Sequence, residues 1–227
     1  MRSSRLFVPL VTLVAVACGP KHHLQDYTFA NRSMAMVYMG PPAPQLLTGA
    51  YDVTEARNPL EAVVMAGTGV AKEIEGRKAN VRLDSAISRV DIAGRLAQQT
   101  LERSSRYLGV RAVNSAEGAD FLLEVHMRSF GIDARGQGAA YLFTNAEVVL
   151  LDRPTGREIW SIDVRGTDPI TPVVRGQDNG AGSIIAAGTL GTVTVAQFQQ
   201  ALEQLMTLSS NLIADELREA LRDARRR

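Results

Sequence analysis

Residues 148–164 read VVLLDRPTGREIWSIDV, two apolar segments joined by a short polar turn. In the turn, Asp152 can hydrogen-bond its own loop, Pro154 fixes φ, and Gly156 accepts a positive φ. After the turn, apolar residues alternate with polar ones, and the apolar face carries Trp160, Ile162 and Val164. A period of two beside a short Gly-containing turn predicts a β-hairpin.

Other segments show the same period or a short apolar run. Residues 121–128 alternate most regularly, as expected for a half-buried antiparallel strand. The predicted strands are 33–39, 110–113, 121–128, 141–151 and 158–166.

Three segments place apolar residues three and four positions apart, the period of an amphipathic helix. The predicted helices are about 60–74, 85–108 and 196–224. We expect the second helix to begin at Ser85 as its N-cap and to end at Gly109. The order of elements predicts an α+β fold: an antiparallel sheet of about four to five strands, helices packed on one face, and a C-terminal amphipathic helix.

The N-terminal residues have the features of an export signal. MRSSR carries two arginines and no acid, and residues 6–17 then lack any charge. This apolar run is shorter than the roughly 20 residues that a membrane span needs. Residues 15–18, Ala-Val-Ala-Cys, resemble a bacterial lipobox, in which the thiol is acylated and the chain is cut before it.

An ordinary signal-peptidase site at the same place stays open, because Ala15-x-Ala17 also fits one. Both interpretations put the cut before Cys18, the single cysteine of the 227 residues. We expect acylation of Cys18, since a lone thiol in an oxidising compartment invites intermolecular pairing. The expected organisation is a lipoprotein signal peptide at 1–17, a tether at 18–32 and one periplasmic domain at 33–227.

The charge of the chain gives no electrostatic reason for binding nucleic acid. Lys and Arg number 25 against 24 Asp and Glu, and removal of residues 1–17 takes away Arg2 and Arg5. The mature charge is therefore near −1. The remaining basic tail, Arg222 and residues 225–227, is expected to stabilise a helix end.

Motifs for catalysis or for metal and cofactor binding are incomplete. Residues 67–72, Gly-Thr-Gly-Val-Ala-Lys, lack the ending of a phosphate loop and lie in a predicted helix. His22 and His23 have only Asp26 nearby and are expected to be surface histidines without a metal. His126 is expected to make a cross-strand polar contact. No nucleophile elbow or zinc-protease helix is present. We therefore expect no catalytic residue, no metal, no cofactor and no enzymatic activity.

The most unusual feature of the mature chain is a Gly-rich loop at 176–195, which carries no charge after Asp178 and leads into an uncharged helix start. Its glycines and threonines make it too polar for a confident membrane span. A loop leading into the last helix is the simpler interpretation. The alternative is a loop or hairpin that contacts a partner or the membrane, since residues 192–195, Thr-Val-Thr-Val, alternate as in a strand. The candidate contact residues are Ile184, Ile185, Leu190, Val193 and Val195.

The hairpin resembles a strand–turn–strand pattern of bacterial envelope lipoproteins of the curli-assembly, penicillin-binding-protein activator and ABC-transport auxiliary types. Residues 118–125, Gly-Ala-Asp-Phe-Leu-Leu-Glu-Val, resemble the segment that leads into a strand in the same group. The resemblance spans about residues 85–167 and implies a TolB N-terminal-like α+β domain. The residues that carry the hairpin pattern are Leu150, Asp152, Thr155, Gly156, Trp160 and Ser161.

We expect a non-enzymatic lipoprotein, held to the membrane by its N-terminal lipid, that serves as an accessory or assembly subunit of a cell-envelope complex. Gly19, in place of an aspartate after Cys18, favours the periplasmic face of the outer membrane. An envelope protein is the expected partner, and a homo-oligomer stays open. Two alternatives remain: an ABC-transport auxiliary lipoprotein in envelope lipid transport, and a subunit of an outer-membrane secretion pore.

Overall fold

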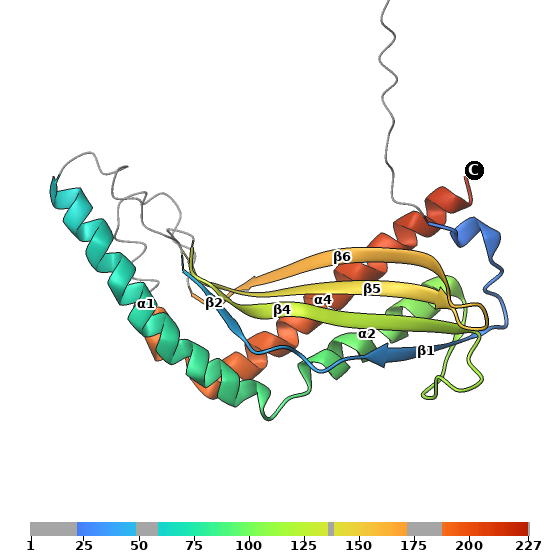
Figure 1. The fold of residues 1–227 in the computed structure, drawn as a ribbon, viewed down its shortest axis with the longest axis horizontal. Coiled ribbons are helices and arrows are strands. Elements are labelled where there is room, and N and C mark those ends of the chain that lie inside the picture. The colour runs from blue at the N-terminus through green and yellow to red at the C-terminus, as the bar shows by residue number, and fades with distance from the viewer. Residues whose placement is uncertain (1–21, 49–58, 136–138, 172–187, 227) are drawn as a thin grey trace, which may run out of the picture.

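The computed structural model describes residues 22–48, 59–135, 139–171 and 188–226. A curved sheet forms one layer, and helices α2 (Ile92–Leu108) and α4 (Val195–Ala224) lie behind it in the view of Figure 1. α2 packs on the β1 side of the sheet, and α4 crosses β5 and β6. The long helix α1 (Pro59–Ile87) extends beyond one end of the sheet.

The sheet has six strands and is mixed. Its order is β3–β1–β4–β5–β6, and β2 also pairs with β4. β1 runs parallel to β3 and to β4, and β2 runs parallel to β4, whereas β4, β5 and β6 are antiparallel. The strands are β1 Ser33–Tyr38, β2 Gln45–Leu47, β3 Arg111–Ala112, β4 Phe121–Asp133, β5 Tyr141–Asp152 and β6 Arg157–Pro169.

The α+β class and the helices on one face are confirmed, but the prediction of a purely antiparallel sheet of four to five strands is wrong. The connection from β1 to β4 passes through α1 and α2 and returns the chain to the same end of the sheet. Parallel neighbours require such a crossover. The period of two is the same in both orientations, so the sequence pattern does not reveal it.

The predicted hairpin is confirmed. Gly156 has φ of 68°, its N–H donates to the Asp152 carbonyl at 2.8 Å, and the Thr155 hydroxyl donates to the Asp152 carboxylate. The strand register shifts between Leu150 and Leu151. Near this irregularity the neighbouring residues Ile159 and Trp160 are both buried, which interrupts the expected alternation.

The helix boundaries differ from the prediction at the connection between α1 and α2. α1 continues to Ile87, so Ser85 lies inside it and is not an N-cap. The N-cap of α2 is Asp91, whose carboxylate accepts hydrogen bonds from the Gly94 N–H at 2.8 Å and the Tyr38 hydroxyl at 2.7 Å. The C-terminal end at Gly109 is confirmed, with φ of 71°.

The N-terminal segment belongs to the core, although residues 18–32 were expected to be a tether. Within its described part, Leu24 is 2% exposed and Phe29 is 8% exposed, and the short helix η1 spans Leu24–Asp26. The Phe29 ring packs on Phe121 of β4 with 5.0 Å between ring centroids. The folded part of the chain therefore begins before Ser33. No helix in the described ranges combines the length and the apolar character needed to cross a membrane.

Candidate functional site

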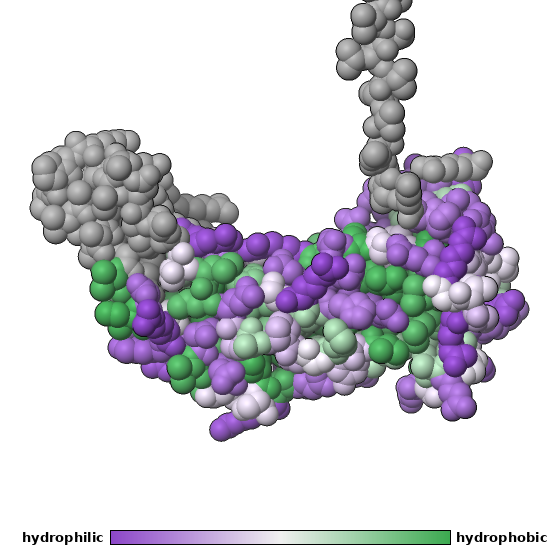
Figure 2. Space-filling view, viewed as in Figure 1, coloured by the Kyte–Doolittle hydropathy of each residue, from purple (hydrophilic) through white to green (hydrophobic). Residues whose placement is uncertain are grey.

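The face of the sheet turned away from α2 and α4 carries most of the paired charges of the strands. We call it the uncovered face; it is turned to the viewer in Figure 1. Figure 2 shows hydrophilic and hydrophobic groups interspersed on this side of the molecule. Alternation directs polar side chains of β4, β5 and β6 onto it. They are Glu124, His126, Arg128, Glu147, Asp163 and Arg165.

Arg128 is the centre of one charged group on the uncovered face. Its guanidinium lies 2.6 Å from the Glu147 carboxylate on β5 and 4.0 Å from the Asp163 carboxylate on β6. The hydrogen bond to Glu147 raises the pKa of Arg128 above its ordinary value. His126 lies 3.2 Å from Glu124 on the same strand, so its polar contact runs along β4 and not across to a neighbouring strand as expected. Three adjacent strands thus hold these charges at fixed spacings.

A second charged group lies toward the other end of the same strands. The Asp133 carboxylate binds Arg135 at 2.6 Å and Arg165 at 2.8 Å. The hydrogen bond from Arg135 holds the pKa of Asp133 below its ordinary value. The Arg165 guanidinium also lies over the Phe143 ring, 5.2 Å from its centroid. The uncovered face therefore presents two charged groups joined by strands β4–β6.

The described part of the uncharged segment packs against the domain. Leu190 is 1% exposed and Val193 is 7% exposed, and both belong to the core. Val195 begins α4 and is partly buried against the same core. Ile184 and Ile185 lie outside the described residues. Leu190 and Val193 are thus not available to a partner or a membrane in this structure.

Arg82 of α1 holds this segment in place. Its guanidinium donates to the Gly191 carbonyl at 2.6 Å and to the Val193 carbonyl at 3.3 Å. Residues 188–192 are helical, so Arg82 places a positive charge at the end of that helical turn, where carbonyls lack partners. The alternation at residues 192–195 therefore does not form a strand. Instead Thr194 caps α4 through a reciprocal capping box with Gln197.

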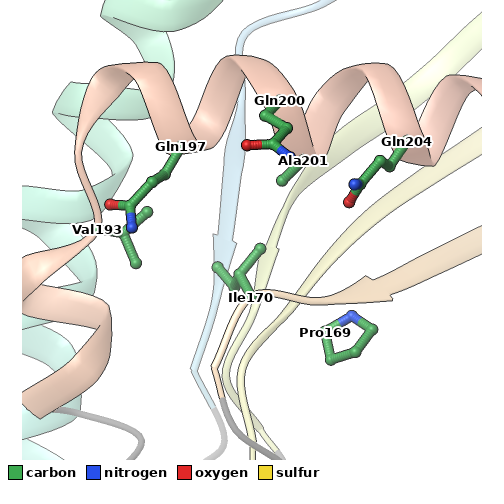
Figure 3. Close-up of a pocket in the computed structure, with 7 residues that line it drawn as sticks. All are labelled: Pro169, Ile170, Val193, Gln197, Gln200, Ala201 and Gln204. Atoms are coloured by element: carbon green, nitrogen blue, oxygen red, sulfur yellow. The ribbon is translucent and has the colours of Figure 1, made fainter.

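A pocket of about 240 Å³ lies between α4 and the end of β6. Figure 3 shows Gln197, Gln200 and Gln204 on the side of α4 that faces Pro169 and Ile170. Its volume is below the roughly 300–1,000 Å³ of ligand pockets. Gln197 is also occupied in the capping box. The pocket therefore gives no strong case for a small-molecule site.

The structure adds contacts of Asp120 and His23 that sequence reasoning missed. Asp120 accepts hydrogen bonds at 2.8 Å from the Ser33 N–H and hydroxyl and from Arg32, which ties the start of β1 to β4. These bonds lower the pKa of Asp120 to about 2, with the Ser33 backbone N–H contributing most. The resemblance of residues 118–125 to other lipoproteins includes Asp120, but it does not indicate these hydrogen bonds. The sequence placed His23 near Asp26 at the surface, and the structure adds a contact with Arg157 that the sequence did not indicate.

Within the described ranges, no group of three or more His, Cys, Asp or Glu side chains is placed to hold a metal ion. Cys18 lies outside those ranges. The arrangement that the structure does bring together is a set of paired charges on rigid strands. Such an arrangement can orient a complementary surface.

No protein-family model matches this chain, and no curated protein matches it. Among solved structures, it is similar to a protein from Caulobacter crescentus CB15 described as a lipoprotein, at 15% identity, TM-score 0.32, covering 56% of this chain and 83% of that one. A DUF330 protein from Xanthomonas campestris is 20% identical, with TM-score 0.34 and coverage of 57% and 63%. The PelC dodecamer from Paraburkholderia phytofirmans is 10% identical, with TM-score 0.30 and coverage of 72% and 89%.

These likenesses are to bacterial proteins that include a lipoprotein. At identities of 20% or less and TM-scores below 0.5, they carry no argument about the activity or partners of this chain. The functional argument therefore rests on the residues of the chain and on their geometry.

Proposed function

We propose that the protein is a lipoprotein of the cell envelope, acylated at Cys18 and facing the periplasm from the outer membrane. One observation carries the proposal. The lone cysteine stands between an uncharged export-type segment and Leu24, the first buried residue in the described part of the chain, only six residues later. A cysteine at this junction suits a covalent anchor, because several acyl chains bind a membrane stably where one is marginal.

The proposed role is that of a non-enzymatic accessory or assembly subunit. The uncovered face supports this role, because its charges are paired across three strands and are held at fixed positions. Fixed charges of both signs favour one orientation of a partner surface and disfavour others. The partner that we propose is a protein of the envelope.

The anchor is tested with Cys18→Ser and with Gly19→Asp. Cys18→Ser should lose incorporation of radioactive palmitate and should leave the membrane fraction. Gly19→Asp should keep the label, and we expect it to shift from the outer to the inner membrane on a density gradient. Unchanged membrane attachment of Cys18→Ser, without label, would refute the lipid assignment.

The accessory role is tested by crosslinking from membranes of the native host. Glu147→Arg reverses a charge at the centre of the uncovered face, and Glu216→Arg makes the same change on an exposed position of α4. We expect an envelope protein in the crosslinked product. Its yield should fall at least tenfold for Glu147→Arg and stay unchanged for Glu216→Arg, because the loss of a charge buried in an interface weakens binding strongly. Equal yields from both variants would remove the uncovered face as the binding surface.

Two observations on protein extracted from the same membranes distinguish the alternatives. Recovery of an inner-membrane ATPase would favour the ABC-transport auxiliary role, and ring-shaped oligomers in detergent would favour the pore. If no envelope protein is recovered with the unaltered chain, the accessory role is wrong.

A further inference from the structure

The described chain begins at a fixed point on the domain. The His23 N–H donates to the Ile159 carbonyl on β6 at 2.7 Å, and the His23 ring lies 2.9 Å from the Arg157 guanidinium. Arg157 also lies 3.5 Å from Asp26 of η1. These contacts attach η1 to the start of β6, beside the β5–β6 turn.

The last turns of α4 lie at the same end of the molecule. Figure 1 shows η1 next to the end of α4, and the two elements are in contact. Leu24 of η1 shares the hydrophobic core with Leu221 and Ala224 of α4. The N-terminal segment and the end of α4 therefore form one surface, which we call the η1 end.

Arginines are exposed on the α4 side of the η1 end. Arg222, Arg225 and Arg226 are all exposed. Asp223 lies 3.8 Å from Arg226. In the described part of the chain, neither Arg222 nor Arg225 forms an ion pair, and Asp26 is already paired with Arg157. Guanidinium groups remain available here for an external anion.

The position of Cys18 limits how far the η1 end can be from the bilayer. Three residues lie between Cys18 and His22, and the four steps of a fully extended chain from one to the other span at most about 14 Å. The opposite end of α4 lies much farther away, because 29 steps from Val195 to Ala224 at 1.5 Å each give about 44 Å. An anchor at Cys18 therefore brings one particular end of the domain to the membrane.

The geometry points to the η1 end as a second membrane contact, in which Arg222, Arg225 and Arg226 bind the phosphate groups of anionic phospholipids around the anchor. This contact rests on the proposed acylation of Cys18. Guanidinium groups match phosphate oxygens in geometry and charge, and each arginine near an anionic surface strengthens attachment roughly fivefold. The contact orients the domain. α1 and residues 188–195 then lie away from the bilayer, and the uncovered face lies on the side of the domain between its two ends.

This orientation is measured by energy transfer to headgroup-labelled lipid in vesicles that carry the purified, acylated full-length protein. One fluorophore is placed at Glu219→Cys near the η1 end and another, in a separate sample, at Gly188→Cys near the other end. Both positions are exposed. Since Cys18 is the only native cysteine and acylation consumes its thiol, the added cysteine is the only thiol available for labelling.

With phosphatidylglycerol in the vesicles, we expect strong transfer at residue 219 and transfer near background at residue 188. Arg222→Gln, Arg225→Gln and Arg226→Gln together should reduce the phosphatidylglycerol-dependent part of this difference roughly fivefold or more. The matched control replaces three exposed arginines away from the η1 end by glutamine, Arg77, Arg89 and Arg95, and should retain the difference. About 1 M salt, where the Debye length is about 3 Å, should act like the first triple variant.

Each result has a distinct meaning. If the protein does not float with phosphatidylcholine vesicles, the anchor is absent, and both the proposed function and this contact are wrong. If it floats, but the two triple variants behave alike, the anchor stands and the arginine contact is wrong. Equal transfer at residues 188 and 219 in phosphatidylglycerol vesicles would also overturn the orientation.

Discussion

The backbone N–H of His23 donates a hydrogen bond of 2.7 Å to the carbonyl oxygen of Ile159. This bond pairs the N-terminal segment with β6, the edge strand of the sheet. An edge strand presents unpaired backbone groups that can recruit other chains, and native proteins cover such edges. The same bond fixes where the chain leaves the fold toward Cys18.

The burial of Leu24 predicts that the N-terminal segment contributes to stability. Leu24→Ala removes a side chain that is 2% exposed, and we expect the free energy of unfolding to fall by about 2–4 kcal/mol. Gln25→Ala changes an exposed neighbour and should stay within about 0.5 kcal/mol. Urea denaturation of the two variants measures both values. A similar small effect for both would mean that the segment is not part of the folded core.

The hydrogen bonds of Asp120 predict a loss of stability in acid. Its pKa falls from an ordinary 3.8 to about 2 in the fold, because the Ser33 N–H and hydroxyl and Arg32 stabilise the carboxylate. The stabilisation is therefore fully present above about pH 4 and is lost as the pH falls toward about 2. Asp120→Asn should be less stable at pH 7 and should lose less stability between pH 4 and pH 2. Unfolding curves across that range test the difference, and parallel pH profiles would contradict it.

Gly131 predicts a strict requirement for glycine where β2 pairs with β4. Its φ is 154°, and a Cβ added there would overlap the Gln45 backbone. Gly131→Ala should lower the free energy of unfolding by about 3 kcal/mol, because backbone atoms cannot make room as a flexible side chain can. Gly40→Ala is the control, since a Cβ at Gly40 meets nothing within 4 Å. Thermal unfolding should separate the two variants clearly, and equal midpoints would show that β2 can shift without cost.

The contacts of Arg82 predict that α1 keeps residues 188–195 in place. Arg82→Gln removes the guanidinium that binds the Gly191 and Val193 carbonyls. We expect at least tenfold faster amide hydrogen exchange in this segment, from a loss of about 1.5–3 kcal/mol for hydrogen bonds to a charged group. Arg89→Gln changes an exposed arginine on the turn after α1 and should leave exchange unchanged. Slow exchange in both variants would show that burial of Leu190 and Val193 is enough to hold residues 188–195 in place without Arg82.

The hairpin, the strand positions and the last helix could be predicted from the sequence because local chemistry determines them. Asp152 and Gly156 set the turn through their own backbone and side-chain geometry. Thr194, by contrast, lies in a segment whose alternation also fits a strand, and in the tertiary structure it instead forms the capping box with Gln197 at the start of α4. The second helix start was wrong for a related reason: Ser85 and Asp91 are both good N-caps, and only packing selects Asp91, which also binds Tyr38.

The sequence by itself determined the α+β class, the hairpin and the position of the one cysteine, since each depends on residues that are near neighbours in the chain. Only the tertiary structure decided that β1 runs parallel to β4, that Leu24 and Phe29 belong to the core, and that Leu190 and Val193 are buried. An apolar side chain gains the same free energy by leaving water for a core or for a membrane. The neighbouring residues in the sequence therefore do not tell whether such a side chain lies in a core or in a membrane. The residues that pack against it from distant parts of the chain decide this.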